Sequence, residues 1–171
     1  MMRRLTGMRA FALLLLFAST VAFAQSAAPE KSDSAKTLEQ QFFAALRAGD
    51  ADKVLSYIPK NGVNIGSNEE HTSRADIEEQ FQKRRGLYCR LFDSACISAT
   101  IDLANSARPC SDRELLTKSE KVRLASSEMT RNGVQQAVLV AEVKNDKCSN
   151  SGLIDFIFNL DADGWKLFSI P

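Results

Sequence analysis

The spacing of apolar residues changes from helical to strand-like near residue 120, and this change restricts the chain to few architectures. Before it, apolar residues recur every three or four positions, as along 37–48 and 73–86. After it, apolar and polar residues alternate, most clearly from Ile154 to Leu160. A helix buries a stripe with a period of 3.6, whereas a strand buries every second side chain. Because the helices precede the strands, the order predicts an α+β fold, with N-terminal helices packed on one face of a curved antiparallel sheet.

Capping residues predict where the helices begin and end. Thr37, with Gln40 three residues later, is typical of a capping box, and Gly49 is typical of the residue that follows a helix. Asp50 can cap a second helix, which Pro59 would end. The expected helices cover 37–48, 51–58 and 73–86, with a shorter one after Ser111.

Turn signals separate the expected strands. Asn132-Gly133 is a strong hairpin signal, and Asp163-Gly164 is typical of another turn. The segment 67–72 is polar and predicts a loop, while 87–103 is compatible with helix, strand or both. The expected strands cover 62–66, 120–131, 134–145, 153–161 and 164–170. The last four should form one antiparallel sheet, with the helix 73–86 against its concave side.

The apolar positions of these elements predict the core. Each lies on the apolar face of its helix or strand, which is the face that turns away from water. The residues expected to be largely buried are Leu38, Phe42, Leu46, Phe81, Leu139, Phe156, Phe158 and Trp165.

The N-terminal segment has the three parts of a secretory signal peptide. Arg3, Arg4 and Arg9 precede an apolar run of roughly 15 residues. This run is shorter than the ~20 residues that a helix needs to span a bilayer. Small residues around Ala24 match an A-x-A cleavage site. We therefore expect a signal peptide over 1–24, a flexible leader over 25–36 and a single domain over 37–171, in a periplasmic or secreted protein with no membrane segment after cleavage.

The charge balance argues against a nucleic-acid partner. Three of the 22 basic residues belong to the signal peptide, so the remaining 19 face 21 acidic ones and leave a net charge near −2. Nucleic-acid binding needs a concentrated basic face. The one basic cluster, Lys83-Arg84-Arg85, lies among glutamates and is typical of a solvated helix end.

The chain has four cysteines, and an even count in an exported domain favours disulfides. Four cysteines allow three pairings. We favour Cys89–Cys96, which closes a short irregular segment, together with Cys110–Cys148, which joins the weakly patterned middle to a loop between strands. No Cys-x-x-Cys pair is present, so the pattern does not indicate a metal site.

Two segments resemble a known family. Residues 42–54 contain Ala45-Leu46-Arg47-Ala48-Gly49-Asp50, and residues 163–171 contain Gly164-Trp165-Lys166. Both are similar to the ends of nuclear transport factor 2-like domains, the cone fold shared with ketosteroid isomerases and SnoaL-like proteins. The resemblance implies that fold, with residues 87–118 departing from the family pattern. The family includes enzymes and binding modules, so the fold leaves the function open.

No complete catalytic set can be assembled from the sequence. By residue type the candidates for acid–base chemistry are Asp155, Tyr57 and Tyr88, while the single histidine, His71, lies in a polar segment. No phosphate loop, cofactor motif or metal motif is present. We therefore expect a binding or interaction module, with a small apolar ligand or a second copy as partner. The alternative is an isomerase- or hydrolase-like enzyme with an acidic residue in an apolar pocket.

Overall fold

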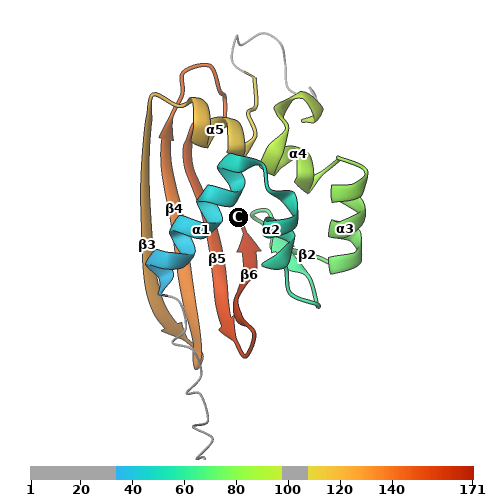
Figure 1. Cartoon of the computed structure of the whole chain (residues 1–171), viewed down its shortest axis with the longest axis vertical. Helices are drawn as coiled ribbons and strands as arrows, with labels where there is room; N and C mark the ends of the chain where they lie inside the picture. The colour runs from blue at the N-terminus through green and yellow to red at the C-terminus, as the bar shows by residue number, and fades with distance from the viewer. Residues whose placement is uncertain (1–33, 98–107) are drawn as a thin grey trace, which may run out of the picture. The chain divides into compact units, whose positions relative to one another are not determined.

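Four long strands form the antiparallel part of the sheet in the computed structural model, which describes residues 34–97 and 108–171 (Figure 1). The expected signal peptide over 1–24 and most of the leader lie outside these residues. The strands are β3 Lys121–Arg131, β4 Val134–Lys144, β5 Gly152–Asp161 and β6 Gly164–Ile170, each antiparallel to the next. Their limits agree with the prediction to within one residue. Positive φ angles at Asn132 and Gly133 form the β3–β4 turn.

Two short strands extend this sheet beyond β6. β1 Val63–Ile65 pairs in parallel with β6, and β2 Glu70–Thr72 pairs antiparallel with β1, which gives the order β2-β1-β6-β5-β4-β3. The sheet is therefore mixed rather than wholly antiparallel. The loop expected over 67–72 is wrong, because residues 70–72 pair with β1 through their backbone although their side chains are polar.

The helices form in the expected order with shifted limits. Ser34, not Thr37, caps the first helix, since the Ser34 Oγ accepts a hydrogen bond from the Thr37 backbone N–H at 3.3 Å. The first helix thus begins before residue 37. Gly49 ends that helix with a φ of 74°, and Asp50 caps the next. The helices are α1 Ala35–Ala48, α2 Ala51–Ser56, α3 Arg74–Gln82, α4 Leu87–Phe92 and α5 Asp112–Lys118, with a 3-10 turn at Ser94–Cys96.

The helix that lies across the sheet is α1, whereas the sequence predicted the helix 73–86. α1 contacts β3 and β4, while α3 packs against α4 at the side of the molecule (Figure 1). The reason is the amount of apolar surface on each helix. α1 buries four large apolar side chains, whereas α3 buries only Ile77 and Phe81.

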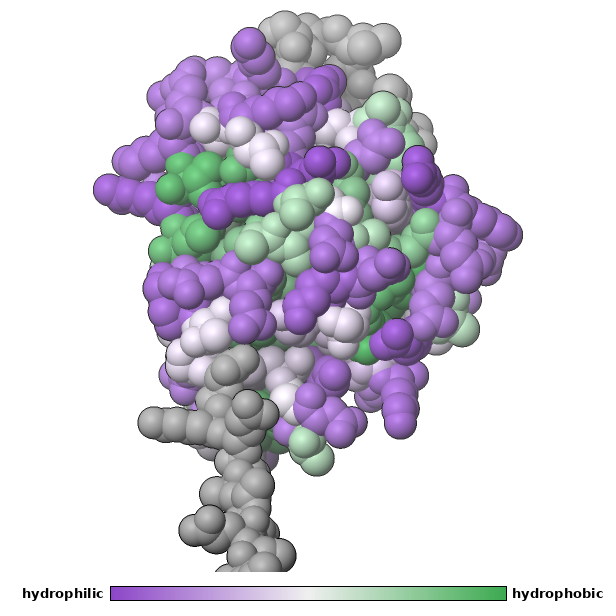
Figure 2. All heavy atoms as spheres, in the orientation of Figure 1, coloured by the Kyte–Doolittle hydropathy of each residue, from purple (hydrophilic) through white to green (hydrophobic). Residues whose placement is uncertain are grey.

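Aromatic rings fill the space between α1 and the sheet. The Phe42 ring centroid lies 4.8 Å from that of Phe156 and 5.0 Å from that of Phe158, in edge-to-face geometry. All eight residues predicted as core are buried. On the helix-covered side, polar and charged side chains cover much of the surface, and apolar atoms are visible in the gaps between them (Figure 2).

The opposite face of the sheet, here called the outer face, carries exposed apolar side chains. Along β5 it presents Leu153, Asp155 and Ile157, because alternate residues of a strand point to opposite faces and Ile154, Phe156 and Phe158 are buried. No helix among the described residues is long and apolar enough to cross a bilayer.

Two disulfides join the cysteines in the favoured pairing. Cys89–Cys96 links α4 to the 3-10 turn, and Cys110–Cys148 ties the segment before α5 to the β4–β5 loop. The pairing predicted from the sequence is confirmed.

Candidate functional site

Tyr57 is a core residue and does not face Asp155. Its ring packs against Phe42 and Phe158 at centroid distances of 5.5 and 5.8 Å, and its hydroxyl donates a hydrogen bond to the Gln41 Oε1 at 3.3 Å. Asp155 points to the other side of the sheet, since the neighbouring Phe156 is buried in this core. The two groups therefore do not form an acid–base pair.

Tyr88 and His71 also lie apart from Asp155. Tyr88, on α4, packs its ring against Phe81 and Phe92, with the Arg84 guanidinium 5.9 Å from the ring centroid. His71 is exposed on β2, where its Nδ1 lies 3.3 Å from the Asn64 Oδ1. In the described part of the chain, no group of three His, Cys, Asp or Glu side chains could hold a metal ion.

Asp155 lies in a groove at the open edge of β5. β6 pairs with β5 only from Ile157 onward, so the first half of β5 has no strand on that side. A groove of about 410 Å³ runs there, and we call it the Asp112 groove. Its charged lining residues come from three elements: Arg90 from α4, Asp112 from α5 and Asp155 from β5. Its apolar walls are formed by Ile97, Pro109, Leu115, Leu153, Ile154 and Pro171.

Asp112 is the buried acid of the groove. Ser111 caps α5 by accepting a hydrogen bond from the Glu114 backbone N–H at 3.2 Å, and this places Asp112 at the first helical position. Its side chain is 5% exposed, and its Oδ2 has no hydrogen-bond partner among the described residues. Burial raises the pKa of Asp112 to about 7, against the opposing effect of the positive charge of Arg90.

Sequence reasoning did not select Asp112. The run from Ser111 to Glu114 matched a capping box, in which an acidic residue in the first turn is ordinary. Only the packing of α5 beside the open half of β5 makes this acid buried. Arg90 was missed for the same reason; it is half-buried and donates a hydrogen bond from its Nη2 to the Pro171 carbonyl oxygen.

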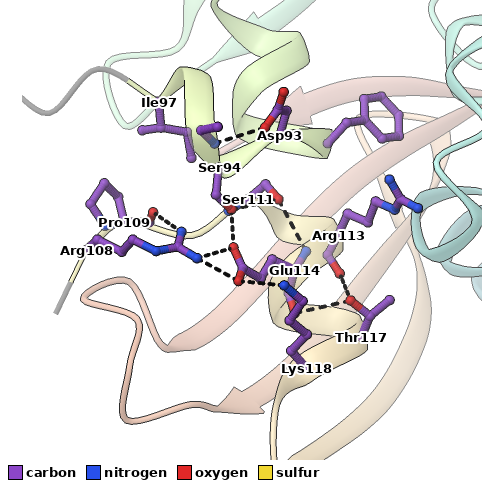
Figure 3. Close-up of a pocket in the computed structure, with 12 residues that line it drawn as sticks. Asp93, Ser94, Ile97, Arg108, Pro109, Ser111, Arg113, Glu114, Thr117 and Lys118 are labelled. Carbon is purple, nitrogen blue, oxygen red and sulfur yellow. Dashed lines mark hydrogen bonds and ion pairs between the residues drawn. The ribbon is translucent and has the colours of Figure 1, made fainter.

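A second hollow, of about 800 Å³, surrounds Glu114 (Figure 3). The carboxylate accepts hydrogen bonds from the Ser94 hydroxyl, from the Arg108 Nη2 at 2.7 and 2.9 Å, and from the Lys118 Nζ at 3.2 Å. The Ser94 bond, followed by those of Arg108 and Lys118, lowers the pKa of Glu114 to about 2 against its partial burial. Both cations, Arg108 and Lys118, are therefore bonded to Glu114, and the bond from Ser94 joins α5 to the 3-10 turn.

These elements define an α+β protein in which helices cover one face of a six-stranded sheet and leave the other face open. No family model matches the sequence, and no curated protein matches it. One solved structure that matches is named as a variant of Rd1NTF2_05. It shares 11% sequence identity with this chain, and the match covers 81% of this chain and 95% of the other, with a TM-score of 0.45.

Proposed function

We propose that this protein is an exported, non-catalytic interaction module of the cone fold, and that it associates with a second copy of itself through the outer face of its sheet. One observation carries the proposal. The described large apolar side chains that are markedly exposed all lie on that face: Met129 at 46%, Val134 at 39%, Leu153 at 71% and Phe168 at 39%. Exposed apolar surface gathered on one face is typical of an interaction site.

The composition of the outer face suits an isologous contact. Half-buried Val138, Val140 and Ile157 lie between the exposed residues, in neighbouring register across β4 and β5. Charges of both signs stand at the rim, where Arg123 and Glu142 form a 3.6 Å ion pair. An apolar centre with a polar rim is the usual anatomy of an interface. The net charge near −2 that remains without residues 1–24 opposes self-association little.

The size of this face limits the strength of such a dimer. Four strands about 4.8 Å apart, each with about eight residues rising 3.3 Å, cover roughly 500 Å² in projection. This area lies below the about 600–1,000 Å² per partner that standard-size specific interfaces bury. We therefore expect a dissociation constant in the micromolar range.

Sedimentation velocity of the protein without residues 1–24 tests the proposal. Between about 5 and 200 µM, the weight-average mass should rise toward that of a dimer, as a micromolar interface requires. Met129→Glu should keep the mass of a monomer, because it replaces an exposed apolar side chain of this face by a charge. Thr130→Glu is the matched control: it is the next residue of β3, also exposed, and points to the opposite face. A monomer at every concentration, or equal effects of the two substitutions, would refute the proposal.

Export is supported by the signal-like N-terminal segment and by the two disulfides, which persist in oxidising compartments. The enzyme alternative is less well supported. Tyr57 and Tyr88 are packed against aromatic rings away from Asp155, and the space between α1 and the sheet is filled by side chains.

A further inference from the structure

Asp155 interrupts the apolar part of the outer face. On its own strand it lies between Leu153 and Ile157, because residues two apart on a strand point to the same side. The residue directly opposite on β4 is Val140, and Val138 is diagonal to it. Asp155 is half-buried. It therefore has apolar neighbours both along its own strand and across to β4.

No protein group neutralises this carboxylate in the described part of the chain, where it has neither a hydrogen bond nor an ion pair. The other diagonal neighbour on β4, Glu142, is paired with Arg123 at 3.6 Å. On the side away from β4 no strand pairs with this half of β5, and the charged residues of the groove there are Arg90 and Asp112. Water at the open surface therefore stabilises the charge of Asp155 in the single chain.

A second copy on the outer face would remove that water. Association covers the apolar residues around Asp155, and a carboxylate among them then loses its hydration, which is costly for a charged group. Both copies of a two-fold contact supply the same patch, so each dimer meets this cost twice. Protonation removes the charge and most of the cost.

We infer that Asp155 sets the strength of self-association and makes it depend on pH: the ionised residue keeps the contact weak, and the protonated residue allows a tighter one. This inference rests on the self-association proposed above and concerns its regulation. Because the dimer binds protons more tightly than the single chain does, the association constant rises as the pH falls. Charged residues beside exposed apolar strand residues commonly limit association in this way.

Sedimentation velocity of the chain without residues 1–24, at pH 7.5 and at pH 5, tests the inference. The association constant should be at least about tenfold higher at pH 5. Asp155→Asn has nearly the same shape but cannot ionise. It should associate at least about tenfold more tightly than the unmodified chain at pH 7.5, and its association constant should change less than about twofold between the two pH values.

Two variants with the same change of charge are the controls. Asp163→Asn alters an exposed position in the β5–β6 turn and should keep the pH dependence of the unmodified chain. Asp112→Asn alters the groove beside β5 and should keep it as well, although the pKa of Asp112 is raised to about 7. Loss of the pH dependence in Asp112→Asn would place the effect in the groove and overturn the inference.

The outcomes separate this inference from the proposal on which it rests. A dimer with equal association constants at both pH values would overturn the role of Asp155 and leave the outer-face dimer standing. Weaker association of Asp155→Asn would do the same, because it would show that the carboxylate meets a cation of the second copy. A monomer in every variant at both pH values would refute the dimer and the inference together.

Discussion

At the scale of single residues, Asp112 shows how position alone changes the chemistry of a side chain. Asp112, Asp155 and Asp163 are identical in type, yet only Asp112 lies buried. Its carboxyl is held between the end of α4 and the open half of β5, where water cannot stabilise the charge. The ionised form of this residue therefore weakens the folded state.

The first prediction is a loss of stability as pH rises. The pKa of Asp112 is about 7 in the folded protein and 3.8 as its ordinary value, so the folded state holds this proton more tightly than the unfolded state. The free energy of unfolding should then fall between about pH 4 and pH 7, by at most roughly 4 kcal/mol, since each pKa unit corresponds to 1.36 kcal/mol.

Urea unfolding at pH 4.5 and pH 8 measures this change. Asp112→Asn cannot ionise, so its free energy of unfolding should fall less between the two pH values than that of the unmodified chain. Asp163→Asn, at an exposed turn position, is the control and should follow the unmodified chain. Parallel profiles for the unmodified chain and Asp112→Asn would show that this carboxyl does not set the pH dependence.

At the scale of elements, stability rests on the contact between α1 and β5. Phe156 and Phe158 are fully buried and share their edge-to-face contacts with the single ring of Phe42. A helix of this length is marginal by itself in water, so α1 depends on this apolar contact for most of its stability.

Truncation of Phe156 to alanine should accordingly cost about 3–5 kcal/mol of unfolding free energy. Phe168→Ala, at a partly exposed aromatic residue of β6, should cost less than about 1 kcal/mol. Both changes are best made in the Met129→Glu background, which removes any contribution from self-association. Denaturant unfolding measures the free energy lost in each variant. Similar losses for the two substitutions would contradict the assignment of the core.

The two disulfides should contribute unequally. They close segments with sequence separations of 7 and 38 residues. In the chain-entropy model the shorter loop is worth about 2.5 kcal/mol and the longer about 4 kcal/mol. Replacing Cys110 and Cys148 by serine should therefore lower the free energy of unfolding more than replacing Cys89 and Cys96. Non-reducing peptide mapping of the unmodified protein checks the pairing itself, and a Cys89 peptide joined to Cys110 would refute it.

At the scale of the whole molecule, the two faces of the sheet have different roles. One face is covered by α1 and α5 and holds the core, and the other leaves apolar side chains open to solvent. This asymmetry is the basis of the interaction module that we propose. We propose that the signal peptide expected over 1–24 directs export.

The corresponding prediction concerns the mature N-terminus. Protein recovered from the periplasm or the medium after expression in a bacterium should begin at Gln25, because signal peptidase cleaves after the A-x-A site. Edman sequencing or intact mass measures this directly. Substituting arginine for Ala24 should slow cleavage and leave the precursor. Recovery of membrane-bound protein with an intact Met1 would show that the segment is an anchor.

Local patterns were enough to predict much of this protein. The period of the apolar residues, the caps at Asp50 and Ser111, and the Asn132-Gly133 turn each depend on contacts within a few residues, so they can be predicted from local sequence. The position of the cysteines in the chain favoured one of the three possible disulfide pairings, and the alternation along β5 placed Asp155 on the opposite face from Phe156 without any tertiary information.

Only the tertiary structure decided which helix covers the sheet, that residues 70–72 join β1 as a strand, and which acid is buried. Each of these depends on the surface that distant segments offer. α1 lies on the sheet because it carries more apolar area than α3, and Glu70–Thr72 is a strand because β1 supplies its backbone partner. Asp112 and Arg90 line one groove beside β5 because α4 and α5 pack where the pairing of β6 with β5 ends. These segments are far apart in the sequence, so no local pattern predicts that they meet.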